Sequence, residues 1–360
     1  MLANTFGTLF RVTTFGESHG DAVGGVIDGC PAGLQFSLSA IHAFLQRRKP
    51  NPQLHGEVST PRIENDDIHF HSGIQHRDED TVITLGSPIA FTVQNRNVRA
   101  QDYTTAIFRP GHADYTYFKK FGIQGITGGG RASGRETVAR VVAGTIAGCL
   151  LEQYDIHVYG GTEAIHNIHG THFNYAQAHT QPLYALDSDV VPRWQERIAE
   201  VKAQGDTVGG IARVIAYGVP AGLGEPVFDK IDARLAYALM SVGTVKGIEI
   251  GAGFTASSYT GSQNNDPIGE EYEQNNAGGI LGGITTGQDI LIRIAIKPIP
   301  SISKEQKTLN SQGEPCTLSI QGRHDTCVLP RVIPVLESMV KLVLTDFLLI
   351  DRARKDIFSF

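Results

Sequence analysis

The chain has 360 residues, 41% of them hydrophobic, which is enough to bury one large core or two ordinary ones. Its formal net charge of -6 and its isoelectric point near 6.1 exclude a protein that is basic overall, as many nucleic-acid binders are, but allow a local cationic pocket. No stretch approaches about 18 uninterrupted apolar residues, and the first residues lack the pattern of a secretory signal. We therefore expect a cytoplasmic protein that neither enters a membrane nor binds nucleic acid.

Apolar residues at helical spacing predict five helices, and β-branched or alternating runs predict five strands. In chain order the predicted elements are a strand at 23–28, a helix at 39–48, a strand at 81–93, helices at 136–153 and 192–204, a strand at 210–217, a helix at 229–242, strands at 247–251 and 289–296, and a helix at 330–354. Strands and helices do not alternate regularly, which disfavours a doubly wound dinucleotide-binding fold. The pattern predicts an α+β chain without a low-complexity linker, in which the polar segment 264–276 forms a mobile loop.

Glycine is unusually frequent, with 41 residues, and many of them stand in pairs or triplets. Glycine is used where the backbone takes a positive φ or approaches a ligand closely. The clusters are compatible with a site assembled from several loops and also with tight turns in a β-rich fold.

Three glycine-bearing segments each carry a histidine: G-E-S-H-G at 16–20, R-P-G-H-A-D at 109–114 and G-R-H-D at 322–325. A histidine flanked by such residues fits a general acid or a ligand contact better than a place on an apolar helix face. The spacing of these histidines matches no metal-binding motif, so no metal site is predicted. A serine hydrolase that uses Ser18 is also disfavoured, although the segment is superficially similar to G-x-S-x-G.

Arginines gather at the same places, and guanidinium groups bind phosphate and carboxylate with two parallel hydrogen bonds. The stretch G-G-G-R-A-S-G-R-E-T at 128–137 leads a glycine loop into a helix start, where backbone N–H groups favour an anion. It resembles a phosphate cradle, and the alternative is an N-capped helix with Glu136 in its first turn. The residues alone therefore indicate a small polyanionic substrate on which histidine side chains act. They support phosphoester or phosphoryl chemistry in general and no narrower reaction.

These same segments resemble the chorismate synthase family, and the resemblance runs nearly from end to end. It is carried by F-G-E-S-H-G at 15–20, R-P-G-H-A-D-Y-T-Y at 109–117, G-G-G-R-A-S-G-R-E-T at 128–137 and G-R-H-D-T-C at 322–327, with G-D-T-V-G-G, G-L-G-E-P-V-F-D-K, V-K-G-I-E-I-G and A-G-G-I-L-G-G-I between them. The resemblance implies a single domain over residues 1–360, built as a β-α-β sandwich in which two antiparallel sheets enclose helices. It also implies a homotetramer.

The implied activity is that of a lyase of the shikimate pathway, which leads to aromatic amino acids. The family eliminates phosphate from C3 and a proton from C6 of 5-enolpyruvylshikimate-3-phosphate in an anti-1,4-elimination that yields chorismate. Reduced FMN takes part and ends as it began. The sequence leaves open whether the chain reduces its own flavin with NADPH or depends on an external reductase. No appended reductase domain is evident in it.

The resemblance also implies roles for individual residues. His112 would protonate the departing phosphate, His19 would hold or protonate the flavin near N1, and Asp325 would serve the N5 side, where the C6 proton is taken. The implied substrate contacts are Ser18, Arg48, Arg135 and Arg323. The implied flavin contacts are Arg131, Ala132, Ser133, Gly243, Thr244, Gly282, Lys297, Pro298, Ile299, Pro300, Ser301 and Arg323.

The sequence departs from the family pattern at three places. Ala132 stands where the family often has serine, and Ile299 and Pro300 stand where it has Thr-Ser, so hydroxyl contacts to the flavin would be lost or replaced by backbone groups. Leu54 stands where a further arginine is common, and Lys49 or His55 would have to compensate. Two rival functions are a ligand-binding protein that kept the fold without catalysis, which the intact histidine and aspartate set disfavours, and a flavin reductase that oxidises a nicotinamide nucleotide.

Overall fold

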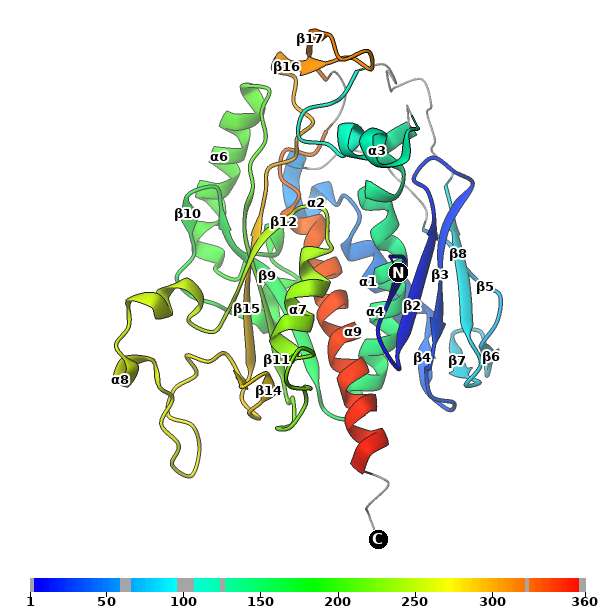
Figure 1. Ribbon diagram of the computed structural model, residues 1–360, viewed down its shortest axis with the longest axis vertical. Coiled ribbons are helices and arrows are strands. Elements are labelled where there is room, and N and C mark those ends of the chain that lie inside the picture. Colours follow the sequence, from blue (N-terminus) through cyan, green and yellow to red (C-terminus); the bar gives the residue numbers. More distant parts are fainter. Residues whose placement is uncertain (1–2, 59–65, 96–106, 124–126, 321–323, 356–360) are drawn as a thin grey trace.

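Two antiparallel sheets of five strands each lie on either side of a layer of helices (Figure 1). The computed structural model describes residues 3–58, 66–95, 107–123, 127–320 and 324–355. The first sheet has the order β1 (Thr5–Phe6), β2 (Arg11–Gly16), β3 (Ala22–Asp28), β8 (Ile89–Gln94) and β5 (Ile68–Phe70). The second has the order β10 (Ile168–His169), β9 (His157–Ile165), β11 (Gly210–Tyr217), β15 (Ile290–Ile296) and β12 (Val245–Ile250).

Shorter strands form three further small sheets. They are β4 (Gln35–Ser37), β7 (Thr81–Thr84) and β6 (Ile74–His76) in one sheet, the pair β13 (Ile280–Leu281) and β14 (Ile284–Thr285), and the pair β16 (Gln306–Leu309) and β17 (Pro315–Leu318).

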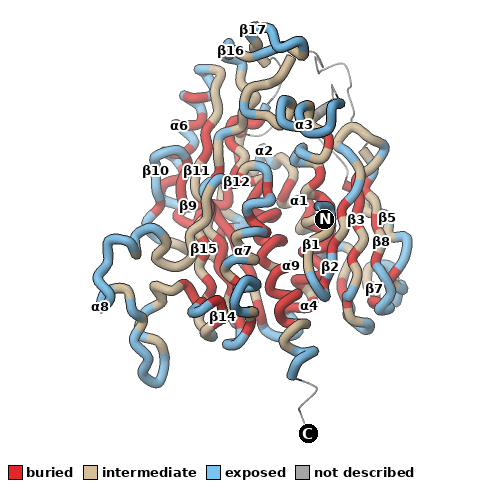
Figure 2. The backbone as a smooth tube through the Cα atoms, in the orientation of Figure 1, coloured by how far each residue is buried: buried red, intermediate tan, exposed pale blue. Residues whose placement is uncertain are grey.

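The helix layer is built around α4 (Thr137–Glu152) and α9 (Leu329–Lys355), which pack against each other. Gly144 permits this contact, because a Cβ at that position would lie 2.3 Å from the Cβ of Ser338. Both helices are buried along most of their length, as Figure 2 shows, and their apolar residues form one continuous core with the inner faces of the sheets. The remaining helices are α1 (Leu38–Arg47), α2 (Pro52–His55), α3 (Asp114–Phe121), α5 (Tyr175–Ala178), α6 (Val191–Ala203), α7 (Ile231–Met240) and α8 (Gly261–Asn264).

A buried carboxylate ties the N-terminal segment to α9. Asp346 accepts hydrogen bonds from the backbone N–H groups of Thr8, Leu9 and Phe10, at 2.8, 2.7 and 3.0 Å. A carboxylate in the protein interior is costly unless such donors satisfy it. The contact thus fixes the start of the first sheet against the central helix.

The α+β class and the five predicted helices are confirmed, with the helix ends within two residues of the prediction. The strand predicted at 81–93 is wrong, because it is divided into β7 and β8, which belong to different sheets. The break falls at Gly86, whose φ of +79° favours glycine, and Pro88, which lacks a backbone donor. The prediction also missed β2, β9 and α3.

The segment 264–276, predicted to be a mobile loop, projects from the body of the molecule next to α8 (Figure 1). Its base is fixed by Asp266, whose carboxylate accepts hydrogen bonds from the N–H groups of Asn276 and Ala277, at 2.7 and 2.9 Å. Among the described residues, no helix combines the length and apolar character that a membrane span requires.

Candidate active site

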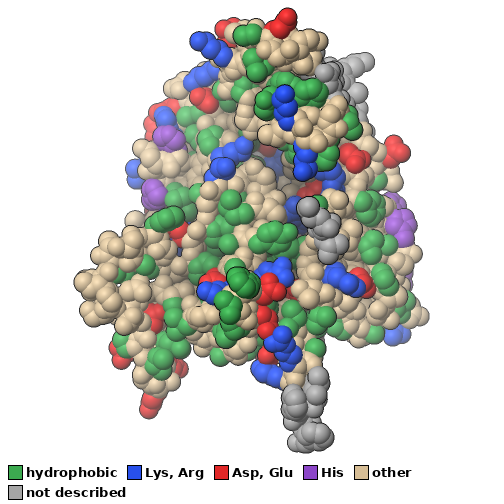
Figure 3. Space-filling view, viewed as in Figure 1, with side chains coloured by type: hydrophobic (Ala, Val, Ile, Leu, Met, Phe, Trp, Pro, Cys, Tyr) green, Lys and Arg blue, Asp and Glu red, His purple; other side chains and the backbone are tan. Residues whose placement is uncertain are grey.

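Apart from Gly282, the described residues of the predicted site belong to segments near the end of the helix layer that lies beneath α3. Figure 3 shows a hollow at this position, with Lys and Arg side chains around it. Four connected groups of residues build the surroundings: the His112 loop, the segment 297–301, the start of α4 with the arginines, and the loop of Ser18 and His19.

His112 lies in the loop before α3, and both nitrogens of its ring have partners. Nδ1 lies 3.0 Å from the carbonyl oxygen of Pro110, and Nε2 lies 3.0 Å from Oγ of Ser301. A carbonyl can only accept, so Nδ1 carries the hydrogen and Nε2 of the neutral ring accepts from the Ser301 hydroxyl. Burial, followed by the nearby charge of Arg109, lowers the pKa of His112 from its usual value. In the free protein the ring is therefore neutral at pH 7, with Nε2 ready to take a proton.

The segment 297–301 is held directly against the His112 loop. The Nζ of Lys297 donates to the carbonyl oxygen of Gly111 at 3.0 Å, and a Cβ at Gly111 would lie 2.7 Å from that of Pro300. The hydroxyl of Thr207 donates to the carbonyl oxygen of Ile299 at 2.6 Å. These contacts place the predicted flavin segment beside the predicted acid.

Gly243 and Thr244 adjoin both this segment and the start of α4. The N–H of Lys297 donates to the carbonyl oxygen of Thr244 at 2.9 Å. The nearest atom to a Cβ at Gly243 would be the carbonyl oxygen of Ala132, at 3.9 Å, so the space there is open. The hydroxyl of Thr244 is buried and has no hydrogen-bond partner among the described residues. A buried hydroxyl without a partner is costly. The cradle formed by Gly243, Thr244 and the segment 297–301 therefore fits a ligand that supplies a polar group, as a flavin would.

The loop of Ser18 and His19 is joined to Arg135 by Asn95, a residue that the sequence analysis missed. The Asn95 amide donates to the carbonyl oxygens of Glu17 and Gly20, at 2.9 and 2.8 Å, and its oxygen accepts from Nε of Arg135 at 2.8 Å. Ser18 Oγ lies 3.0 Å from Nδ1 of His19. Asn95 directly follows β8, and a polar residue at the end of an alternating strand was the signal available in the sequence.

Asp66 lies between the two described arginines that were predicted to bind substrate, and it too was missed. Its carboxylate accepts from Arg135 and from Arg48, the latter at 3.4 Å, and at most 8% of any of the three side chains is exposed. Burial alone would raise the pKa of Asp66, but the charges of Arg48 and Arg135 outweigh it and hold the pKa below its usual value. Lys49 lowers it further, so its positive charge acts on the same cluster.

The structure distinguishes between Lys49 and His55, the two residues that would have to compensate for the arginine absent at Leu54. His55 is 1% exposed, and its Nδ1 accepts from the backbone N–H of Leu183 at 3.0 Å. Burial lowers the pKa of His55 to about 4, so it carries no charge at neutral pH. Of these two residues, Lys49 is therefore the one that adds a positive charge near Asp66, whereas His55 supports the fold.

Two residues predicted to contact flavin use their side chains within the protein. The guanidinium of Arg131 donates to the hydroxyl of Thr14 at 2.6 Å and to the carbonyl oxygens of Thr14 and Gly16, at 3.1 and 3.2 Å. The hydroxyl of Ser133 accepts from the N–H of Arg135 at 3.3 Å and caps a short 3-10 turn, Gly134–Glu136, ahead of α4. Any contact of these residues with a flavin would come mainly from backbone groups.

Asp325 is 8% exposed and pairs with Nη1 of Arg331 at 2.6 Å. The next residue, Thr326, accepts from the backbone N–H of Val208, whose neighbour Thr207 bonds to Ile299. Asp325 therefore lies near the segment 297–301. Arg323, predicted to contact both substrate and flavin, lies outside the described residues.

Gly282 stands apart from the other predicted contacts. It lies in the turn between β13 and β14, and Figure 1 places β14 near the opposite end of the molecule from α3. Its φ is +61°, and a Cβ there would meet no atom within 4 Å. Within one chain, Gly282 is not brought together with the other candidate residues.

Comparisons with known proteins point to one family. The family model described as chorismate synthase matches residues 10–349. Relatives named chorismate synthase include those of Maridesulfovibrio salexigens, 50% identical over 98% of this chain and 99% of the relative, and Syntrophus aciditrophicus, 51% identical over the same shares. A solved structure titled as the crystal structure of chorismate synthase superposes with a TM-score of 0.76 at 30% identity, covering 96% of this chain and 93% of the other. The chain belongs to the chorismate synthase family.

Proposed function

We propose that the chain catalyses the elimination of phosphate from 5-enolpyruvylshikimate-3-phosphate to give chorismate, a lyase reaction that leads toward aromatic amino acids. The observation that carries this function is the position of His112, held at both ring nitrogens beside the cradle formed by Gly243, Thr244 and the segment 297–301. The family match over residues 10–349 supports the same reaction.

The substrate carries a phosphate and two carboxylates, and Arg48, Arg135 and Lys49 supply the matching positive charge. Asp66 offsets part of that charge while no substrate is bound, which limits the repulsion among buried cations. Guanidinium groups whose geometry is already fixed bind anions without the cost of ordering flexible side chains. We assign Ser18 and Arg323, the latter outside the described residues, to the same binding surface by family resemblance.

His112 acts as the general acid for the departing phosphate. Its pKa is low in the free protein, but the charge of a bound phosphate favours the imidazolium form and raises the pKa toward the working pH. The proton would leave from Nε2, because Nδ1 remains bonded to the carbonyl oxygen of Pro110. Ser301, which bonds to Nε2, holds the ring in place until the phosphate arrives.

Reduced FMN, when bound, supplies electron density to the elimination and is not consumed. Thr244, Gly243, Ala132 and the backbone of residues 297–301 would hold it, with Arg131 and Ser133 acting chiefly through backbone groups. His19 would lie near N1 of the flavin and Asp325 near N5, where Arg331 orients the carboxylate. NADPH would serve only as a source of electrons for reducing the flavin.

We also propose the expected β-α-β sandwich as one domain over residues 1–360, and a cytoplasmic homotetramer. The two sheets with α4 and α9 packed between them support the sandwich. The remote position of Gly282 supports an assembly, since that residue can contact flavin only if the cradle is completed by another protomer.

The test is anaerobic formation of chorismate from 5-enolpyruvylshikimate-3-phosphate with dithionite-reduced FMN, with and without NADPH. Product with chemically reduced FMN alone establishes the lyase, and product from oxidised FMN and NADPH shows that the chain reduces its own flavin. Binding of substrate and flavin without product would instead favour a ligand-binding protein. Oxidation of NADPH without need for substrate, and without chorismate, would favour a flavin reductase.

A further inference from the structure

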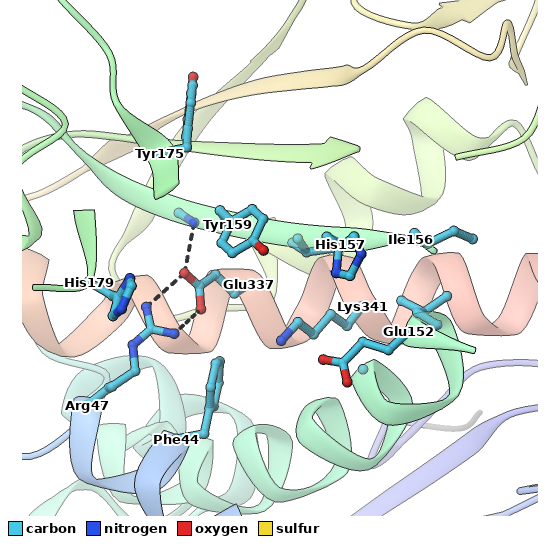
Figure 4. A pocket seen from close by; sticks show the side chains of 14 residues that line it. Phe44, Arg47, Glu152, Ile156, His157, Tyr159, Tyr175, His179, Glu337 and Lys341 are labelled. Atoms are coloured by element: carbon cyan, nitrogen blue, oxygen red, sulfur yellow. Dashed lines mark hydrogen bonds and ion pairs between the residues drawn. The ribbon is translucent and has the colours of Figure 1, made fainter. Parts of the chain in front are cut away.

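A second pocket lies between α1, α4, α9 and β9 (Figure 4), and none of the candidate active-site residues lines it. Its volume is about 260 Å³, near the lower end for small-molecule sites. The walls combine aromatic and aliphatic side chains with two histidines, two carboxylates and two cationic groups. Those four charged residues are Arg47, Glu152, Glu337 and Lys341.

Arg47 and Glu337 form a closed pair inside this pocket. The guanidinium donates from Nη1 to Oε2 at 2.7 Å and from Nη2 to Oε1 at 2.8 Å. The backbone N–H of Gly160 donates to Oε1 at 2.7 Å, and Glu337 is only 2% exposed. The two charges cancel, so this pair has little attraction left for a ligand.

Lys341, one helical turn after Glu337, is in a different situation. It makes no hydrogen bond or ion pair with any residue that the structure describes, and its Nζ lies 4.4 Å from the centre of the Phe44 ring. Gly148 makes room for it, since a Cβ there would come within 3.1 Å of Cδ and 3.3 Å of Nζ. Burial is the largest influence on the pKa of Lys341 and lowers it, while the nearby carboxylates of Glu337 and Glu152 act in the opposite direction.

The surroundings of Lys341 select the charge and shape of a ligand. Figure 4 shows its amine directed into the cavity between the Arg47–Glu337 pair and Glu152. A monoanion would pair with the ammonium, whereas a dianion would bring a second negative charge close to the carboxylate of Glu152. Phe44, Leu151 and Tyr159 offer apolar surface to the rest of the molecule.

We propose that this pocket is a second small-molecule site, which binds a small carboxylate with an aromatic or apolar body. The carboxylate pairs with Nζ of Lys341, and the body lies against Phe44 and Tyr159. The site goes beyond the proposed elimination, because neither the substrate nor flavin is assigned to it.

Titration of the full-length protein with benzoate, followed by ligand-observed NMR, tests the proposal. The matched probe is benzamide, which has the same shape without the charge. We expect Lys341→Met to weaken benzoate binding at least tenfold and to leave benzamide binding unchanged. The matched control Lys307→Met removes an exposed lysine from β16 and should leave both probes unaffected.

Two further variants make the result specific. Gly148→Ala should weaken benzoate binding severalfold, because the new methyl group displaces the ammonium while alanine suits the helix better than glycine. Arg135→Gln reports on the arginines of the candidate active site. Benzoate binding that survives Lys341→Met but is lost in Arg135→Gln would place the anion there and overturn the proposal, as would equal affinity for benzoate and benzamide.

Discussion

Nε2 of His112 lies 3.0 Å from Oγ of Ser301, a residue 189 positions further along the chain. Ser301 ends the segment that the family resemblance assigns to flavin, and His112 is the residue that it assigns to protonation. The fold thus brings two assignments made from separate motifs into direct contact.

Replacement of His112 by alanine should lower turnover by about 10²- to 10⁴-fold, the usual contribution of a positioned general acid. Substrate binding should remain largely intact, because the change leaves Arg48 and Arg135, the proposed substrate contacts, in place. The measurement is chorismate formation with dithionite-reduced FMN, together with substrate affinity by calorimetry. His172→Ala, which removes a histidine side chain that is 87% exposed, is the control. Turnover equal to that of the unmodified protein would remove His112 from its proposed role.

The sequence predicted the central helices because each is long and strongly periodic. It failed at residues 81–93, where the β-branched residues on either side of the turn at Gly86 belong to two different sheets, and at α3, which starts at Asp114 inside the R-P-G-H-A-D segment. Periodicity describes the burial of one segment and carries no information on which sheet that segment joins.

The histidine and arginine candidates came from motifs, but the residues that hold these side chains in position did not. Asp66 and Asn95 act through side chains that are far away in the sequence, and neither stands in a pattern that marks a site. Only the folded arrangement shows that Asn95 holds the Ser18 loop and Arg135 together. The use of Arg131 and Ser133 within the protein was likewise invisible in the sequence.

Asp66→Asn should destabilise the substrate-free protein by about 3–5 kcal/mol, because two buried guanidinium groups would lose their shared carboxylate. The anionic substrate can replace the missing charge. Substrate should therefore raise the melting temperature of the variant more than that of the unmodified protein. Thermal unfolding with and without substrate measures both effects.

The control for this experiment is Asp28→Asn, which removes a carboxylate whose partner, Arg11, is half exposed. That change should have little effect on stability. Equal substrate-induced shifts in Asp66→Asn and in the unmodified protein would show that the arginines do not depend on Asp66.

His55 should make the protein less stable in mild acid. Its pKa is about 4 in the folded state and 6.5 as the ordinary value, so below pH 6.5 the unfolded chain binds a proton that the folded protein does not. Stability conferred by the neutral ring is complete above pH 6.5 and falls by about 3 kcal/mol as the pH drops to 4. Protonation is opposed because Nδ1 already accepts from Leu183. Denaturant unfolding across this pH range should show a shallower decline in His55→Gln than in the exposed control His172→Gln, and parallel declines would contradict the assignment.

Arg47 and Arg48 are consecutive at the end of α1, yet their side chains take part in different clusters. Arg48 meets Asp66, whereas Arg47 meets Glu337. Arg48→Ala should therefore raise the KM for 5-enolpyruvylshikimate-3-phosphate at least tenfold. Arg47→Ala should leave that KM unchanged but destabilise the protein by about 3–5 kcal/mol, because Glu337 is buried and would keep only the Gly160 donor. Steady-state kinetics and denaturant unfolding of both variants separate the two effects, and an unchanged KM in Arg48→Ala would count against Arg48 as a substrate contact.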